Sequence, residues 1–187
     1  MPRPARYTSD VLLDAAAELL AAEGPAAVTM SAVARATGAP SGSLYHRFPT
    51  RAALCGELWV RTEERFQERL LEALSSVDDA QQRCVAGALH TLQWCRENPV
   101  EAQVLLAGPD ELALGEWPEP IGGRRKRLQR RLRRALSDIP GDGGRLNAAL
   151  IDVPTAIVRR HLRARQAIPV SADEIVADCA RALIGPS

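Results

Sequence analysis

The sequence lacks any long uncharged segment, which limits the classes of protein to which it can belong. Of its 187 residues, the longest run without a charged side chain is the twelve residues from Cys84 to Cys95. This run is shorter than the roughly 20 residues that span a membrane. Asp14 and Glu18 interrupt the apolar stretch near the N-terminus, so no signal peptide is indicated. We therefore expect a soluble, cytoplasmic protein with no membrane partner.

Motifs for metal binding and catalysis are also missing. The four cysteines form no CxxC pair and have no histidine at ligand spacing, which favours small buried apolar roles. Cys84 and Cys95 would lie about 16 Å apart along one helix, too far for a disulfide. Neither GxSxG nor a P-loop occurs, and the three histidines are far apart in the sequence. We predict no cofactor, no metal and no enzymatic activity.

Charge is nearly balanced over the whole chain but unevenly distributed within it. A formal net charge of +1 gives no global indication of nucleic-acid binding. The segment 28–51 nevertheless contains Arg35, Arg47 and Arg51 and no acidic residue. Within the first third of the chain, positive charge is therefore concentrated in this segment and in the N-terminal arm.

This segment predicts two short helices joined by a tight turn at Gly38. Thr29 is the expected N-cap of the first helix and Ser41 that of the second. In the second helix Leu44 and Phe48 lie four residues apart on one face and are expected to pack inward. The opposite face carries small, hydrogen-bonding or basic residues: Gly42, Ser43, Tyr45, His46 and Arg47. A rigidly held helix with such a face fits the DNA major groove.

The segment resembles the tetracycline-repressor family of bacterial one-component regulators. The shared landmarks are Gly24, Thr29, the pair Val33-Ala34, Gly38, the block from Ser43 to Phe48, and the basic Arg51. The resemblance covers roughly the first third of the chain, and it departs from the family at two places. Arg51 stands where lysine is usual, and Ala39-Pro40 replaces a commoner Val-Ser turn.

The resemblance also implies which residues contact DNA. The positions matching base-edge contacts are Ser31, Ser41, Gly42, Ser43, Tyr45 and His46. The positions matching phosphate contacts are Thr29, Tyr45, Arg47 and Arg51. An arm at residues 2–6 is expected to add minor-groove or backbone contacts.

Helical patterns separated by turn signals continue through the rest of the chain, and no segment indicates a strand. We expect helices at 9–23, 51–75, 79–97, 121–138, 145–165 and 172–184, and a shorter one ending near 107. The predicted fold class is all-α, with an N-terminal three-helix head containing the helix-turn-helix and a larger C-terminal helical body. We assign DNA binding to residues 1–49, and ligand binding and dimerisation to residues 50–187. Pro154 predicts a kink or a local break in its helix.

The last two helices are candidates for a dimer interface, since one head alone contacts only a few base pairs. In the resembling family these helices pair across a dimer. The candidate interface residues are Leu146, Leu150, Val153 and Ile157 on one helix and Ile175, Cys179 and Leu183 on the other. The alternative is that both apolar stripes pack into their own body.

The resemblance further implies a pocket for a small-molecule effector in the body. Candidate lining residues are Trp59, Phe66, His90, Trp94, Gln103 and Trp117, and the alternative for each is ordinary core packing. The basic run Arg124–Arg134 is either a second anion-binding surface or a solvated helix face. We favour the solvated face, neutralised by acidic residues of the preceding connection: Asp110, Glu111, Glu116 and Glu119.

The functional prediction is a DNA-binding transcriptional regulator, a repressor by family tendency. It binds a palindromic double-stranded operator as a homodimer and is released by a small-molecule effector. Two alternatives remain open at this point. One is a helical adaptor without DNA binding, and the other is an unrecognised small-molecule enzyme.

Overall fold

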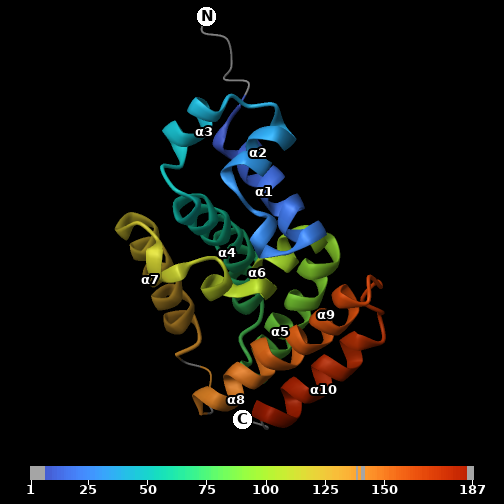
Figure 1. Cartoon of the computed structure of the whole chain (residues 1–187). Helices are drawn as coiled ribbons and strands as arrows, with labels where there is room; N and C mark the ends of the chain where they lie inside the picture. Colours follow the sequence, from blue (N-terminus) through green and yellow to red (C-terminus); the bar gives the residue numbers. More distant parts are fainter. Residues whose placement is uncertain (1–6, 138, 140–141, 185–187) are drawn as a thin grey trace, which may run out of the picture. The chain divides into compact units, whose positions relative to one another are not determined.

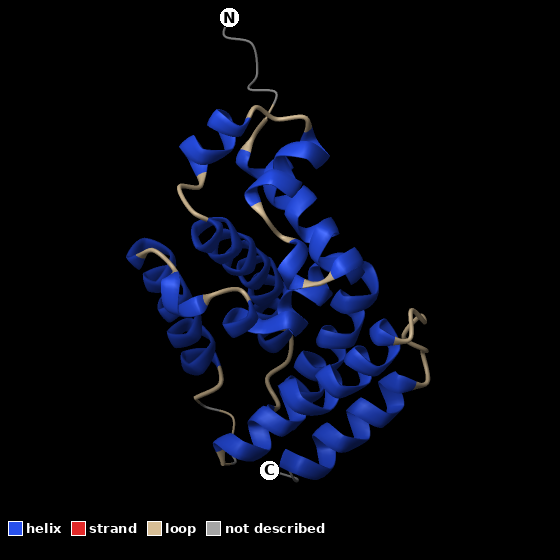
Figure 2. Cartoon of the chain, viewed as in Figure 1, coloured by secondary structure: helices blue, strands red, loops and turns tan. Residues whose placement is uncertain are grey.

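The chain folds into helices joined by short connections. The computed structural model describes residues 7–137, 139 and 142–184. Within that part of the chain every regular element is helical and no strand is present (Figure 2). The predicted all-α fold class is confirmed. None of the described helices combines the length and the apolar character needed to cross a membrane.

The helices belong to two compact units. The first unit comprises residues 1–63 and 103–126, and the second comprises residues 64–102 and 127–187. The long helix α4 (Arg51–Ser75) contributes its first half to one unit and its second half to the other. The predicted division between residues 49 and 50 assigns DNA binding to one part and ligand binding to the other. The packed units do not test that assignment, so it stays a prediction.

The head lies in the first unit and consists of α1 (Ser9–Glu23), the short 3-10 turn η1 (Pro25–Ala27), α2 (Met30–Thr37) and α3 (Ser41–Arg47) (Figure 1). The Thr8 hydroxyl caps α1 by accepting a hydrogen bond from the backbone N–H of Val11 at 3.3 Å. Gly24, with φ of 88°, ends the helix in a conformation that favours glycine. The buried face of α1 consists of Leu12, Leu13, Ala16, Ala17 and Leu20.

The first unit also contains the last part of α6 (Pro99–Glu111), the 3-10 turn η2 (Leu114–Glu116) and the first turns of α7 (Glu119–Ala135). The connection after η2 and the first turn of α7 pack closely on α4 at Gly56. A Cβ added there would lie 3.0 Å from side-chain atoms of both Trp117 and Ile121. An ion pair between Arg124 and Glu57, at 2.6 Å, joins α7 to α4 beside that contact.

The second unit contains α5 (Ala80–Glu97), α8 (Gly143–Asn147), the π-helical turn η3 (Ala148–Asp152), α9 (Val153–Arg163) and α10 (Ala172–Ile184). Helix α10 packs along α5 and lies beside α9 (Figure 1). Arg96 of α5 fixes the start of α10, because its Nη2 donates to Asp173 at 2.7 Å and to the Pro169 carbonyl at 2.8 Å.

The break predicted at Pro154 is confirmed by η3, which ends two residues before it. Proline has no N–H, so the α-helical hydrogen bond from residue 154 to the carbonyl of Leu150 cannot form. The hydroxyl of Thr91 on α5 lies 3.5 Å from that carbonyl and donates to it. The freed acceptor thus contributes to packing between helices of this unit.

Candidate functional site

A three-residue turn, 38–40, joins α2 to α3. Thr29 caps α2 as predicted, since its hydroxyl accepts a hydrogen bond from the Ala32 N–H at 3.1 Å. At the other end Gly38 adopts the left-handed conformation with φ of 69°. Thr37 closes the same end by donating to the Val33 carbonyl at 2.8 Å. The pair therefore has the short glycine-containing turn of a helix-turn-helix.

The start of α3 differs from the prediction for Ser41. Pro40 occupies the N-cap position with φ of −58°, and no side chain caps the helix. The prediction that Ser41 is the cap is therefore wrong: Ser41 is the first helical residue. Proline fixes φ near the value this position needs, so the turn forms without a capping hydroxyl. The Ser41 side chain is left exposed.

The two faces of α3 are oriented as predicted. Leu44 is completely buried and Phe48 is only 4% exposed, so these two side chains anchor the helix from behind. Tyr45 is 52% exposed. The side chains of His46 and Arg47 are also exposed, as is Gly42, whereas Ser43 is half-buried. The structure thus presents a polar, basic helix face to solvent, and the DNA contacts assigned to it stay predictions.

Arg51 has a role within the head that its position in the sequence did not predict. Its Nε donates to the carbonyl of Val28 at 2.7 Å, and its Nη2 donates to the carbonyl of Pro25 at 2.8 Å. The guanidinium therefore holds the connection between α1 and α2 against the start of α4. The predicted phosphate contact of Arg51 stays a prediction, whereas this structural role is observed.

A second arginine of α4 also joins the head and was missed by sequence reasoning. The buried guanidinium of Arg61 lies 3.1 Å from the carboxylate of Asp10 and 2.8 Å from that of Asp14. The two aspartates lie four residues apart and so share one face of α1, and this spacing was the available signal. The arm at residues 2–6 lies outside the described residues. Ser31 on α2 is exposed, and its hydroxyl lies 3.2 Å from that of Thr29.

The comparisons with known proteins agree with this geometry. Residues 12–58, which contain α2, its turn and α3, match the family model described as bacterial regulatory proteins, tetR family. In this N-terminal part the chain is therefore similar to the tetR family. The matched segment includes the exposed polar face of α3.

Two relatives and two solved structures extend the comparison. An uncharacterized HTH-type transcriptional regulator, found in two strains of Mycobacterium tuberculosis, is 29% identical over 100 residues, covering 54% of this chain and 50% of the relative. The chain thus spans about half the length of the curated relatives it matches.

The solved structures show that this chain shares its fold, over most of its length, with other proteins. A TetR family transcription regulator from Marinobacter aquaeolei VT8 aligns with a TM-score of 0.74 and 15% identity, covering 94% of both chains. FadR from Bacillus subtilis, in complex with stearoyl-CoA, aligns with a TM-score of 0.69 and 15% identity, covering 95% of this chain and 98% of the other. At these identities the likeness establishes the fold.

The structure divides the predicted ligand-binding residues between two clusters. Phe66, His90 and Trp94 form one cluster in the second unit, where the Phe66 ring centroid lies 5.7 Å from that of His90 and 5.2 Å from that of Trp94. Trp59 and Trp117 form the other cluster in the first unit, with ring centroids 5.8 Å apart. Gln103 is half-buried on α6.

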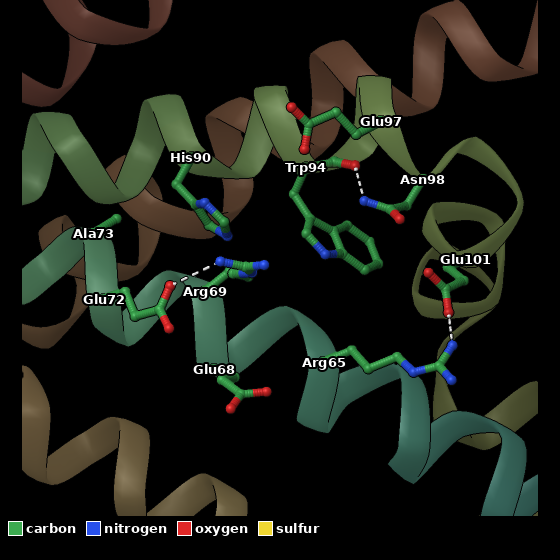
Figure 3. Close-up of a pocket in the computed structure, with 10 residues that line it drawn as sticks. All are labelled: Arg65, Glu68, Arg69, Glu72, Ala73, His90, Trp94, Glu97, Asn98 and Glu101. Atoms are coloured by element: carbon green, nitrogen blue, oxygen red, sulfur yellow. Dashed lines mark hydrogen bonds and ion pairs between the residues drawn. The ribbon is translucent and has the colours of Figure 1, made fainter.

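The cluster in the second unit borders a groove of about 820 Å³ between α4, α5 and the start of α6. His90 and Trp94 point from α5 toward α4 in this groove (Figure 3). Its lining is more polar than that expected of an effector pocket, with four glutamates and two arginines. The charged lining residues are Glu68, Glu72, Glu97, Glu101, Arg65 and Arg69.

Both arginines of the groove are already paired with carboxylates. Arg65 lies 2.5 Å from Glu101, and Arg69 lies 3.2 Å from Glu72. Burial lowers the pKa of His90 below its ordinary value, although a hydrogen bond to the Phe66 backbone acts in the opposite direction. The groove therefore holds a neutral imidazole and an excess of carboxylates at neutral pH.

The predicted interface residues occupy different environments in the second unit. On α10, Ala172, Val176 and Ala180 are buried, whereas Ile175 on the other face is 55% exposed. Cys179 and Leu183 continue that second face and are half-buried. On the preceding helices, Leu146, Val153 and Ile157 are half-buried. Leu150, by contrast, is 2% exposed and packs inside its own unit against Gly87, so the expectation that it faces a partner is wrong.

The basic run on α7 is only partly as expected. Arg124 pairs with Glu57 of α4, and the Cζ of Arg125 lies 5.6 Å from the ring centroid of Trp59. These two arginines thus both contact α4. Farther along the helix the basic side chains are exposed: Arg127, Arg130, Arg131, Arg133 and Arg134. Leu128, on the opposite face, is buried.

Proposed function

We propose that this protein is a homodimeric repressor that binds a palindromic operator and leaves it when a small molecule binds the helical body. The observation that carries the proposal is the exposed polar face of α3, held from behind by Leu44 and Phe48. Hydroxyl and imidazole groups on that face suit base edges, and Arg47 suits phosphate. In a bacterium such a regulator acts in the cytoplasm, where operator DNA is accessible.

The homodimer is supported by the exposed face of α10. Ile175, Cys179 and Leu183 recur every four residues, so they form a continuous apolar stripe apart from the buried face. A two-fold axis through this stripe would bring α10 of one protomer against α10 of its partner. Two heads spaced by about 34 Å, one turn of DNA, would then contact two half-sites of a palindrome.

Effector control is supported by the two aromatic clusters of the body, which place tryptophan rings beside polar groups. The B. subtilis protein of the same fold holds stearoyl-CoA, so the fold can hold a ligand. A ligand that favours one head spacing over another changes operator affinity by its coupling free energy. A coupling of about 1–3 kcal/mol corresponds to roughly a 5- to 150-fold change.

The two alternative functions fit the head less well. An adaptor that used its helices only for protein contacts would not require an exposed basic helix face free of acidic residues. An enzyme would require a nucleophile or an acid–base pair brought together by the fold, and the matched proteins are named as regulators. Sequence-specific retention on DNA distinguishes the proposed regulator from both alternatives.

The test is selection of duplexes from a randomised DNA library by the purified protein at moderate salt. We expect the selected duplexes to share an inverted repeat, with half-site centres about 10 base pairs or a multiple of that number apart. Enrichment of no common sequence would contradict the proposal. Enrichment of a single unrepeated half-site would contradict its dimeric part.

A further inference from the structure

Two adjacent tryptophans of the first unit differ in their hydrogen bonding. Trp59 and Trp117 are each 8% exposed. The indole Nε1 of Trp117 donates to the carbonyl of Leu112 at 2.8 Å. The Nε1 of Trp59 is equally shielded from solvent, but among the described residues it has no acceptor. A buried N–H without an acceptor is destabilising and unusual, so an acceptor is expected from elsewhere.

Two consecutive arginines beside these rings also differ in whether they have a partner. The Nη1 of Arg124 donates to the Glu57 carboxylate at 2.6 Å. Arg125 is half-buried and forms no ion pair with any described residue, and its Nε is shielded from solvent without an acceptor. Its Cζ lies 5.6 Å from the centroid of the Trp59 ring. Attraction to the ring compensates the guanidinium only in part, because the ring carries no net charge.

We propose that Arg125 and Trp59 together bind an anionic group, a carboxylate or a phosphate, of the effector. An anion accepts hydrogen bonds from both unpartnered donors and neutralises the guanidinium at the same time. A neutral acceptor would leave the charge of Arg125 uncompensated, and a cation would be repelled. The arginines of the groove in the second unit offer no such site, since both are paired with glutamates.

The regulatory role of this anion site rests on the proposed function. Packing within the first unit links the site to the head. Arg125 lies on α7 next to Arg124, whose partner Glu57 is on α4. The same half of α4 carries Arg51 and Arg61, which hold the head. An anion held by both Arg125 and Trp59 therefore changes a contact between α7 and the helix on which the head is fixed.

The test measures binding of four eight-carbon probes that differ only in their polar group: octanoate, octyl phosphate, octanol and octyltrimethylammonium. Calorimetric titration of the purified full chain gives each affinity. We expect octanoate, octyl phosphate or both to bind the wild type at least tenfold more tightly than octanol and octyltrimethylammonium, and the stronger of the two identifies the anion. Arg125→Gln and Trp59→Phe should each weaken that binding about tenfold or more, since each removes a hydrogen bond to a charged group. Arg127→Gln is the matched control, because it removes the same charge from an exposed position of the same helix.

A second measurement needs no ligand. If Arg125 serves to bind an anion and has no structural partner, Arg125→Met should leave the melting temperature of the free protein unchanged or raise it. A clear fall in that temperature would assign Arg125 to structure and overturn the proposal. Three binding results would also overturn the proposal: equal binding of all probes, no binding of any probe, or equal affinities of Arg125→Gln and Arg127→Gln. The partner of the Trp59 N–H would then be water. Anion binding by a protein that selects no common DNA sequence would retain this site and reject the proposed function.

Discussion

The Nε of Arg51 donates a hydrogen bond to the carbonyl oxygen of Val28, with 2.7 Å between the two atoms. The bond joins the first residue of α4 to the residue that precedes the cap of α2. A second bond from the same guanidinium, to Pro25, makes this side chain a clamp on the connection between α1 and α2. The position of the helix-turn-helix therefore depends on a residue that is not part of it.

Replacing Arg51 with alanine should lower the stability of the folded protein, in addition to any loss of a DNA contact. The change leaves two carbonyl groups without their charged donor, which costs about 1–3 kcal/mol. We expect a lower midpoint of urea unfolding for Arg51→Ala. Arg51→Lys should recover only part of the loss, because lysine lacks the planar fork that bonds both carbonyls. An Arg51→Ala protein as stable as the wild type would show that the clamp contributes nothing.

Arg47 should behave in the opposite way. Its side chain is exposed, and its one observed hydrogen bond, to the hydroxyl of Ser9, is long at 3.4 Å. We expect Arg47→Ala to leave the urea midpoint unchanged and to lower the salt dependence of DNA binding by about one unit of slope. A slope equal to that of the wild type would remove Arg47 from the phosphate contacts.

The proposed dimer predicts a change in mass when charge is placed on the exposed face of α10. Ile175→Glu should convert the protein to a monomer, because the buried carboxylate would have no partner across the two-fold axis. Val170→Glu is the control, since Val170 is 77% exposed and precedes α10. Sedimentation equilibrium distinguishes the two forms. A dimeric Ile175→Glu protein would place the interface elsewhere.

Thiol labelling offers an independent test of the same interface. Burial raises the pKa of Cys84 to about 11 and that of Cys95 to about 12, so both should resist alkylation until the protein unfolds. Cys179, half-buried on the face proposed for dimerisation, should react faster as the protein is diluted. Labelling of Cys179 that is independent of protein concentration would argue against its burial between protomers.

His90 should make the stability of the protein depend on pH below neutrality. Its folded-state pKa is lowered from 6.5, chiefly by burial, although Glu97 and Glu72 act in the opposite direction. The unfolded chain therefore takes up a proton first, so stability is complete above pH 6.5 and falls as the pH drops toward the folded-state value. His90→Gln should lose less free energy of unfolding between pH 7.5 and 5.5 than the wild type. Equal losses would mean that other groups cause the pH dependence.

The exposed arginines of α7 should contribute little to DNA binding if they are a solvated face. We consider a fourfold variant in which arginines of α7 are changed to glutamine: Arg127, Arg130, Arg131 and Arg134. It should alter the salt dependence of DNA binding no more than a control variant that loses the same charge from α9 and the residues that follow it. That control changes Arg159, Arg160, Arg163 and Arg165, which are also exposed. A slope that falls by several units only in the α7 variant would establish a second DNA-binding surface.

Local signals in the sequence predicted most of the helices. The expected ranges 9–23, 51–75 and 172–184 coincide with α1, α4 and α10, because glycines, prolines and capping residues mark those ends. The range 121–138 was displaced from the observed Glu119–Ala135, since Pro120 is tolerated in the first turn of a helix.

The contacts that side chains make through tertiary packing could not be predicted from local signals. The sequence shows that Arg51 and Arg125 are basic, but only the fold shows that one clamps two carbonyls while the other lies over an indole ring. Leu150 likewise fits an apolar stripe by spacing, yet the absence of a side chain at Gly87 lets it pack inward. Such contacts depend on residues distant in the sequence, which periodicity does not pair.

The exposed face of α3 is the surface proposed to contact the operator. The most direct test is the affinity of Tyr45→Ala for a duplex selected by the wild-type protein, measured by fluorescence anisotropy at fixed salt. Because Tyr45 is 52% exposed and anchors nothing, its removal should leave the melting temperature and the oligomeric state unchanged. We predict that Tyr45→Ala loses specific binding and falls to the affinity of random DNA. Wild-type affinity in this folded variant, and in Arg47→Ala as well, would contradict the account.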